Sequence, residues 1–265
     1  MACRKCEGRG FYYERGEGVR LCSCVEDLCR CEGRKPYQYF DDRTEAAWCS
    51  CRPYRLAMGR TGQFFEASNV PAKYRGCFLE DFRERTSDDA PIPGAVELKG
   101  LVGSLLDRCG AGDSAARGLL LWGVPGSGKT MLCCIALNEL MLRCARPGKF
   151  LDLSFGYFQT LRGSYNRESR DYGQSTQIIE ALTDVPFLVI DDFGLAKDTE
   201  WAQEMLYNLV DARYQEERVT LVTANKNVEE FRELAGGRIY SRFMEMFHIV
   251  HVQAPDYRMS LARTF

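Results

Sequence analysis

The sequence predicts an α/β protein with a three-layer core around a mainly parallel sheet, preceded by a small cysteine-rich module. Three observations lead to this prediction. From residue 118 onward, short apolar runs alternate with helical segments. A glycine-rich stretch separates the first apolar run from the helix that follows it. Eight of the 13 cysteines fall within the first 51 residues, and all eight are in close pairs.

The expected strands are short and apolar, as is typical of strands that are buried on both faces of a sheet. In chain order they are Leu119–Trp122, Lys149–Leu153, Pro186–Asp191, Val219–Asn225 and His248–Val252. The helices expected between them include Lys129–Cys144 and the amphipathic segment Glu200–Glu217. Strands that alternate with helices favour parallel pairing.

Composition divides the chain into three parts. Residues 1–60 show almost no aliphatic periodicity, so metal must substitute for a hydrophobic core in this module. Residues 61–117 form a connector that contains the expected helix Ala95–Cys109, and residues 118–265 form the α/β core. No run approaches 18 apolar residues and no apolar leader opens the chain, so we expect neither a transmembrane helix nor a signal peptide.

The glycine-rich stretch GVPGSGKT fits the phosphate-binding pattern G-x-x-x-x-G-K-[ST] in full, and it has the strand-then-helix context that the pattern requires. Its glycines let backbone N–H groups turn toward phosphate oxygens. The lysine is expected to reach the β- and γ-phosphates of ATP, and the threonine hydroxyl to bind Mg²⁺. The predicted nucleotide-binding residues are Gly123, Val124, Pro125, Gly126, Ser127, Gly128, Lys129 and Thr130.

Two adjacent carboxylates end the buried strand FLVIDD. Asp191 is expected at the edge of the sheet beside the phosphate loop, where it can hold Mg²⁺ directly or through water. Asp192 is the candidate to polarise the attacking water. Asn225 ends the next strand, and we expect it to position that water near the γ-phosphate. Each residue could instead serve only as a turn residue, but their order behind the phosphate loop favours the catalytic interpretation.

Arginines follow a Gly-Gly turn in GGRIYSRF (Gly236–Phe243). They could simply be solvated helix positions. In ring-forming ATPases, however, an arginine directed at the neighbouring subunit's γ-phosphate completes the active site. We assign this role to Arg242, with Arg238 as the alternative. Arg258, in PDYR, is expected to contact the nucleotide in its own subunit.

The order of these motifs resembles the DnaC/DnaI helicase-loader and IstB branch of the AAA+ ATPases. GVPGSGKT is followed by FLVIDDFGLAKDTEWAQEMLYNLVDARY, TLVTANKNVEEF, GGRIYSRFMEMF and PDYR. The earlier segment NVPAKYRGCFLEDF also resembles the one that precedes the ATPase domain in that branch, so the similarity covers roughly residues 65–260. It implies an AAA+ core, ATP-dependent homo-oligomerisation, contact with single-stranded DNA and the handling of a hexameric replicative helicase.

The resemblance also implies extra structure for DNA contact between the second strand and the acidic strand. Here that stretch is Leu153–Gly173, in which aromatic residues are interleaved with arginines that can stack bases and neutralise phosphates. Phe155, Phe158 and Leu161 are instead expected to form a buried helix face. The predicted DNA contacts are Arg162, Tyr165 and Arg167.

The paired cysteines predict structural zinc. A nucleotide-hydrolysing core works in the cytosol, where paired cysteines bind metal rather than form disulfides. The natural sets are Cys3, Cys6, Cys22 and Cys24 for one ion, and Cys29, Cys31, Cys49 and Cys51 for a second. Interleaved pairing stays open, because spacing cannot fix connectivity, and an iron–sulfur cluster is the alternative use of the thiolates.

Charge favours a protein partner over DNA for this module. The whole chain has a formal net charge of −2, and residues 1–60 hold 12 Lys/Arg against 9 Asp/Glu. Two tetrathiolate zinc centres would bring the module to about −1. Since helicase contact is usually made by the N-terminal part in loaders, the resemblance implies that this module docks onto the helicase. His248 and His251, the only histidines, are expected to be structural.

Three functions remain in competition at this stage. A helicase loader would bind single-stranded DNA and a replicative helicase. An IstB-type ATPase would assemble on double-stranded DNA and contact a transposase, although that pattern normally has a helical segment where this chain is rich in cysteine. An adaptor would bind partners through zinc and use ATP only as a switch.

Overall fold

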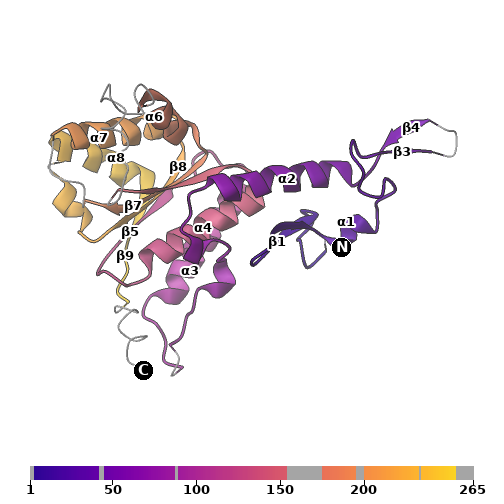
Figure 1. The fold of residues 1–265 in the computed structure, drawn as a ribbon. Helices are drawn as coiled ribbons and strands as arrows, with labels where there is room; N and C mark the ends of the chain where they lie inside the picture. Colours follow the sequence, from indigo (N-terminus) through magenta and orange to yellow (C-terminus); the bar gives the residue numbers. More distant parts are fainter. Residues whose placement is uncertain are drawn as a thin grey trace.

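The computed structural model describes residues 3–41, 45–86, 89–153, 175–194, 200–232 and 234–254. Its centre is a sheet of five strands in the order β6-β7-β8-β5-β9, in which every neighbouring pair is parallel (Figure 1). Each strand lies within one or two residues of its predicted range, so the parallel sheet is confirmed. The strands are β5 (Gly118–Trp122), β6 (Gly148–Asp152), β7 (Phe187–Phe193), β8 (Val219–Ala224) and β9 (Phe247–His251).

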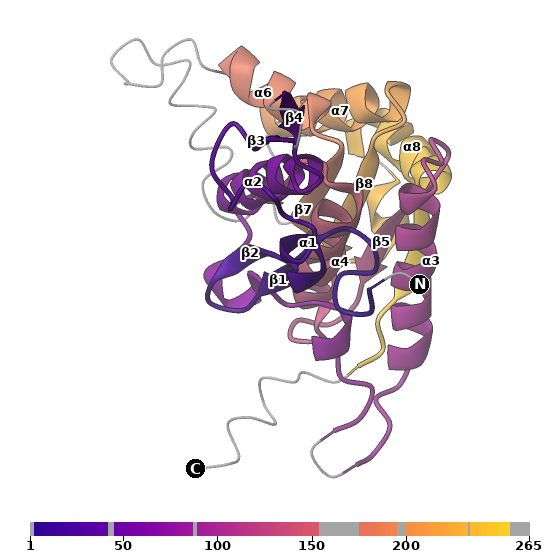
Figure 2. The same cartoon turned by 90° about the vertical axis from the view of Figure 1, so that its right-hand side faces the viewer.

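Helices cover both faces of the sheet and form the predicted three layers (Figure 2). Side chains of β5 alternate between the two faces. Leu121 packs in the core under α3 and α4, whereas Leu120 packs in the core under α6, α7 and α8. The helices are α3 (Ala95–Gly110) and α4 (Lys129–Cys144) on one face, and α6 (Ser175–Asp184), α7 (Glu200–Gln215) and α8 (Arg238–Met246) on the other.

The cysteine-rich module consists of two small antiparallel hairpins. The first pairs β1 (Phe11–Glu14) with β2 (Gly18–Leu21), and the second pairs β3 (Gln38–Phe40) with β4 (Ala46–Trp48). The short helix α1 (Ser23–Glu26) lies between them, and α2 (Arg52–Ala67) leads to the core. Helix α2 runs across residue 60, so one continuous element joins the module to the connector; the division at residues 60 and 117 stays a prediction.

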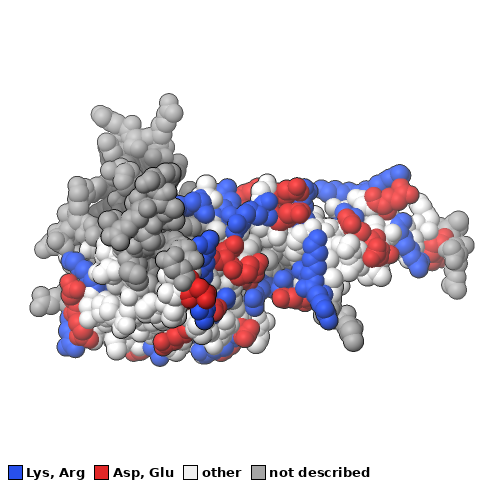
Figure 3. Space-filling view, turned by 90° about the horizontal axis from the view of Figure 1, so that it is seen from below, with Lys and Arg blue, Asp and Glu red and all other residues white. Residues whose placement is uncertain are grey.

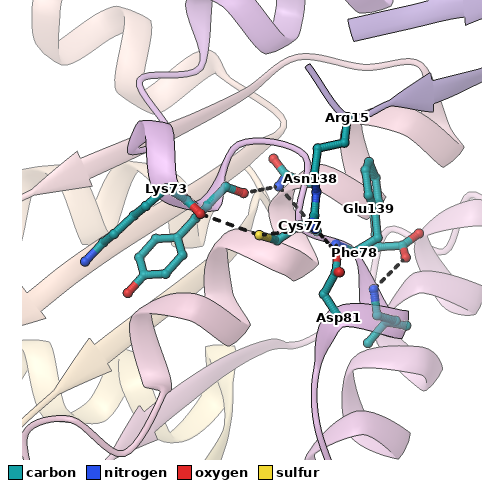
Figure 4. Close-up of polar contacts among 9 residues, drawn as sticks. Arg15, Lys73, Cys77, Phe78, Asp81, Asn138 and Glu139 are labelled. Atoms are coloured by element: carbon teal, nitrogen blue, oxygen red, sulfur yellow. Dashed lines mark hydrogen bonds and ion pairs between the residues drawn. The ribbon is translucent and has the colours of Figure 1, made fainter. Parts of the chain in front are cut away.

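The connector is fastened to α4, the helix that begins with the end of the phosphate loop. Two 3₁₀ turns, η1 (Ala72–Tyr74) and η2 (Leu79–Asp81), lie against it (Figure 4). The fully buried Asn138 side chain donates hydrogen bonds to the carbonyl oxygens of Tyr74, at 2.9 Å, and Cys77, at 3.0 Å. The carboxylate of Glu139 accepts from the backbone N–H of Leu79 at 3.2 Å.

The first hairpin of the module also contacts the connector. Arg15 forms an ion pair with Asp81 at 2.7 Å (Figure 4). The Tyr13 ring lies 4.8 Å from the Phe65 ring and 5.3 Å from the Phe78 ring, measured between centroids. Strand β1 therefore shares the hydrophobic core on the α3–α4 side of the sheet.

Surface charge is mixed on the face seen in Figure 3, where the described lysine and arginine side chains are interspersed with aspartate and glutamate. Among the described helices, none is both long enough and apolar enough to cross a membrane.

Candidate functional site: a phosphate loop at the carboxyl edge of the sheet

The phosphate loop turns sharply between β5 and α4, at the carboxyl edge of the sheet where α/β proteins bind their ligands. Gly128 precedes the helix with a φ of 92°, in the left-handed region that favours glycine. Gly123 is required for a different reason, since a Cβ atom there would lie 2.5 Å from the carbonyl oxygen of Val252. Val252, the residue that follows β9, therefore leaves no room for a side chain at position 123.

Lys129 is 5% exposed and folds back over its own loop. Its ammonium group donates to the carbonyl oxygens of Gly123, at 2.9 Å, and Val124, at 2.8 Å. A third contact reaches the Ser127 hydroxyl at 3.4 Å. The positive charge is therefore held inside the loop, where a phosphate group is expected.

Thr130 and Asp191 lie side by side, as predicted for a Mg²⁺ site. The Thr130 hydroxyl donates to Oδ1 of Asp191 at 2.9 Å, and the Thr223 hydroxyl donates to the same oxygen at 2.6 Å. Burial raises the pKa of Asp191, an effect that these two hydrogen bonds oppose and that nearby Asp192 and Asp152 reinforce. A hydroxyl and a carboxylate within hydrogen-bonding distance are hard oxygen donors, so the pair fits Mg²⁺.

Asp192 and Asn225 also meet at this edge. The Asn225 amide donates to Oδ1 of Asp192 at 3.2 Å. Asp192 has a φ of 57°, and its backbone N–H donates to the Thr223 hydroxyl at 3.0 Å. Lys129, Thr130, Asp191, Asp192 and Asn225 therefore gather at one edge of the sheet.

Sequence reasoning missed Thr223, which contacts both aspartates. The available signal was its position on strand β8, two residues before Asn225 and therefore on the same side of the strand. Threonine is so common in strands that this position alone does not mark function.

The candidate arginines lie on α8 and face α7 of the same chain. Arg242 forms an ion pair with Asp211, with a shortest distance of 2.6 Å, and this contact raises the pKa of Arg242. Its guanidinium also lies 5.3 Å from the centroid of the Tyr214 ring, and that of Arg238 lies 4.3 Å from the Tyr207 ring. Both of these partners of Arg242 lie in the DARY sequence of α7, residues 211–214. Arg162, Tyr165, Arg167 and Arg258 lie outside the described residues.

The eight N-terminal cysteines form the two predicted groups of four. Within each group all sulfur atoms lie within 4.8 Å of one another. Individual Sγ–Sγ distances are 3.7 Å for Cys3–Cys22 and 3.5 Å for Cys31–Cys51. Four sulfurs bound at about 2.3 Å to one tetrahedral ion would be about 3.8 Å apart. The geometry therefore fits one metal ion in each group.

Backbone groups favour the thiolate at some cysteines of each group, whereas the hydrogen bond with Cys22 raises the pKa of Cys24 to about 12 and burial raises the pKa of Cys51 to about 12. Hydrogen bonds from the backbone N–H groups of Cys6 and Lys5 lower the pKa of Cys3 to about 7. At Cys49 burial acts in the opposite direction, but the backbone N–H groups of Cys51 and Arg30 prevail and lower the pKa to about 6. Thiolate is the form that binds metal.

The histidines lie on β9. His251 stacks on Trp122, with ring centroids 3.8 Å apart and the planes nearly parallel. This contact joins the ends of two neighbouring strands and agrees with a structural role.

The sheet order, the phosphate loop and the carboxylates opposite it define a P-loop ATP-binding protein with the AAA+ fold. Residues 112–263, more than half of the chain, match the family described as IstB-like ATP binding protein. The chain belongs to this family.

Individual relatives agree with the family assignment. Over 196 residues the chain is 26% identical to the replicative helicase loader DnaC of Escherichia coli strain K12, a match that covers 71% of this chain and 69% of DnaC. It is also 26% identical over 233 residues to the phage-like element PBSX protein XkdC of Bacillus subtilis strain 168, covering 84% of this chain and 82% of XkdC.

Solved structures share the fold. The crystal structure of the DnaC helicase loader superposes with a TM-score of 0.53 at 20% identity, covering 68% of this chain and 99% of that one. The crystal structure of DnaI gives a TM-score of 0.55 at 18% identity, covering 70% of this chain and 95% of DnaI.

Proposed function

We propose that the protein is an ATPase that loads a hexameric replicative helicase onto single-stranded DNA. The observation that carries this proposal is the hydrogen-bonded group of Thr130, Asp191, Asp192 and Asn225 beside Lys129, in a chain similar to DnaC. The fold accounts for ATP binding. The second carboxylate, Asp192, is proposed to orient the water that hydrolysis requires.

In the proposed reaction, water attacks the γ-phosphorus and the bond to the bridging oxygen of ADP breaks. Lys129 exchanges its loop carbonyls for the β- and γ-phosphate oxygens. Asp192 accepts a hydrogen bond from the water and orients it, while Asn225 holds that carboxylate in place. Thr130 and Asp191 would hold Mg²⁺, which would supply positive charge to neutralise the phosphates.

Arg242 completes the proposed site from the neighbouring subunit. In the single chain it is paired with Asp211, so it is already held on the surface of α8 with its charge retained. ATP then links two subunits, because one binds the phosphates and the other neutralises the charge that develops during hydrolysis. Assembly in this proposal is therefore controlled by nucleotide. The contact of Arg258 with the nucleotide of its own subunit stays a prediction.

The N-terminal module is the proposed docking site for the helicase, with one structural zinc ion in each cysteine group. Figure 1 places the β3–β4 hairpin at the end of the module farthest from the sheet. Phe40 is 76% exposed and Trp48 is 56% exposed, and the strand register puts both on one face of this hairpin. Exposed aromatic side chains of this kind are enriched in protein interfaces, and the near-neutral module offers no electrostatic preference for DNA.

Single-stranded DNA contact by Arg162, Tyr165 and Arg167 completes the proposal. The experiment that tests the function is a pull-down of the purified protein against a replicative helicase, with and without ATP. Capture of the helicase, together with ATP-dependent self-association, supports the loader. If the helicase does not bind and ATP leaves the oligomeric state unchanged, the loader function is wrong.

A transposition-assisting ATPase is the second candidate, because the matched family is described as IstB-like. A parallel pull-down against a transposase separates the two functions. The same assay run with double-stranded DNA adds an independent readout, since the transposition ATPase is expected to assemble on it. Partner binding with intact ATP binding but little turnover would indicate the ATP-switched adaptor.

A further inference from the structure

The two catalytic-site aspartates occupy a bulge in the sheet. Along β7 and β8, Ile190 pairs with Val222 and Phe193 pairs with Ala224. Two residues of β7, Asp191 and Asp192, therefore lie opposite the single residue Thr223 of β8. Such a bulge redirects side chains at the end of a strand, and bulges are common beside active sites.

The bulge requires unusual backbone geometry at Asp192. Its φ of 57° lies in the left-handed region, which is unfavourable for residues other than glycine, although aspartate tolerates it better than most. The Asp192 backbone N–H donates instead to the Thr223 hydroxyl, at 3.0 Å. A backbone group that has left the regular ladder has thus found a side-chain acceptor.

The same hydroxyl donates its proton to Oδ1 of Asp191 at 2.6 Å. Thr223 is fully buried, so water does not compete for these bonds. Oδ1 of Asp191 also accepts from Thr130, and the carboxylate of Asp192 accepts from Asn225. The hydroxyl oxygen of Thr223 therefore links Asp191, which contacts Thr130 of the phosphate loop, with Asp192, which contacts Asn225.

We propose that Thr223 is a positioning residue that fixes the two carboxylates relative to each other, holding Asp191 toward Thr130 for Mg²⁺ and Asp192 toward the attacking water. This inference rests on the proposed ATP hydrolysis. Thr223 itself lies behind both carboxylates and acts only through them. A methyl group in place of its hydroxyl would leave the Asp192 N–H without its acceptor and Asp191 with one donor fewer.

The test compares variants that differ in the hydroxyl alone. Thr223→Val keeps the shape of the side chain and removes the oxygen, and Thr223→Ser keeps the oxygen. We expect Thr223→Val to lower kcat about 10- to 100-fold, as residues that orient metal ligands commonly do. It should also raise the Mg²⁺ concentration needed for half-maximal rate, whereas Thr223→Ser should stay within about threefold of wild type.

Two controls separate positioning from folding. Thr61 is a buried threonine whose hydroxyl has no hydrogen-bond partner in the described part of the chain, so Thr61→Val removes the same group without the same contacts. It should leave kcat and the Mg²⁺ requirement unchanged. If Thr223→Val does not fold, the smaller pair Thr223→Ser and Thr223→Ala makes the same comparison.

A binding measurement keeps the inference distinct from the proposed function. The affinity of a fluorescent ATP analogue, measured with and without Mg²⁺, does not require hydrolysis. Thr223→Val should bind like wild type without Mg²⁺ and gain less affinity when Mg²⁺ is added. A wild-type protein that never hydrolyses ATP would contradict the proposed function alone. Wild-type kcat and Mg²⁺ response in Thr223→Val, or equal loss in the Val and Ser variants, would overturn the role of Thr223.

Discussion

Lys129 holds its positive charge inside the phosphate loop. Its ammonium group bonds two carbonyl oxygens of the loop and is almost fully buried. The bonds from this ammonium to carbonyl oxygens are already charge-assisted, because the donor is ionised. A phosphate offers negatively charged oxygens instead, so binding adds the attraction between opposite charges.

Replacing this lysine tests that exchange. We expect Lys129→Ala to weaken ATP binding by at least about 100-fold, the equivalent of one lost charge-assisted contact. Titration of a fluorescent ATP analogue measures the change. Lys99→Ala serves as the control, because Lys99 forms a surface ion pair with Glu84 and should bind ATP normally. Unaltered affinity in Lys129→Ala would show that this loop does not hold the phosphates.

Arg242 pairs with Asp211 of its own chain. Its test must therefore separate a role in the active site of the neighbouring subunit from a role in stabilising its own chain. Arg242→Ala should bind ATP normally and lose hydrolysis on the order of 1,000-fold. Asp211→Asn removes the ion pair and keeps the arginine, so it should retain most activity. Arg238→Ala tests the alternative arginine in the same assay.

Mixing two inactive variants adds a direct test of sharing. A Lys129→Ala subunit retains Arg242, and an Arg242→Ala subunit retains Lys129. In an equal mixture about a quarter of head-to-tail interfaces should combine both intact residues, so hydrolysis should return. A mixture that stays inactive, or an Arg242→Ala variant with normal hydrolysis, would rule out the assignment.

At the scale of single residues, proximity was predictable where the chemistry fixes both residue type and spacing. The phosphate-loop pattern and an apolar strand that ends in carboxylate predict that Thr130 and Asp191 lie together, as they do. Their roles, and that of Lys129, stay predictions. Thr223 was not predictable, because its role depends on a bulge between β7 and β8. Its partner Asp192 lies 31 residues away in the sequence. A local pattern contains no information about that register.

At the scale of elements, α7 is held to the sheet by a buried arginine. Arg213 is fully buried and bonds the carbonyl oxygens of Leu182, Thr183 and Val185, which follow or end α6. It also bonds the carbonyl of Val219 and the Thr220 hydroxyl at the start of β8. Burial, with a contribution from Arg218, lowers the pKa of Arg213 to about 9.

The planar guanidinium of Arg213 presents several N–H donors in a fixed geometry, so it can bond all of these oxygen atoms at once. Lysine carries its donors on a single nitrogen and cannot replace it. We expect Arg213→Lys to destabilise the protein by about 2–4 kcal/mol, because several buried carbonyl groups lose their donor. Urea unfolding followed by circular dichroism measures the change. Arg232→Lys is the matched control: that arginine pairs with Glu229 on the surface, and its replacement should cost less than about 1 kcal/mol. Equal stability of both variants would contradict the structural role.

The elements themselves were largely predictable from sequence. Helix α4 has its predicted bounds, and the strands shift only at their ends. Strand β7 is longer than predicted because the bulge lets Asp192 and Phe193 continue past Asp191. The small hairpins of the module were not predicted individually, since they contain few residues and almost no apolar alternation.

At the scale of the whole molecule, the module depends on its cysteines. The second hairpin packs in a cluster whose buried members are Val25, Cys31, Cys49 and Cys51, which is too small to fold a domain without a further constraint. The grouping of the eight sulfurs supplies such a constraint once a metal is bound. The predicted sets are confirmed in the structure.

Metal analysis of the full chain tests this dependence. We expect two zinc ions per chain, one for each group of four cysteines. Cys51→Ser should lose one ion and unfold the second hairpin. Cys77→Ser should keep both, because Cys77 lies outside the two groups. Iron in place of zinc would indicate the alternative cofactor, and a metal-free folded protein would contradict the whole interpretation.

The connector packs against α4, and this contact determines how short a fragment of the chain can be and still stay dispersed in water. The family match begins at residue 112, but the outer surface of α4 is covered by residues before that point, among them Phe78, Leu98 and Val102. A fragment cut at residue 112 would lose α2, α3 and the connector residues that pack against α4, and would leave Asn138 without its acceptors. Uncovering buried apolar side chains promotes aggregation, so a fragment bounded by the family match is shorter than the part of the chain that we expect to stay dispersed.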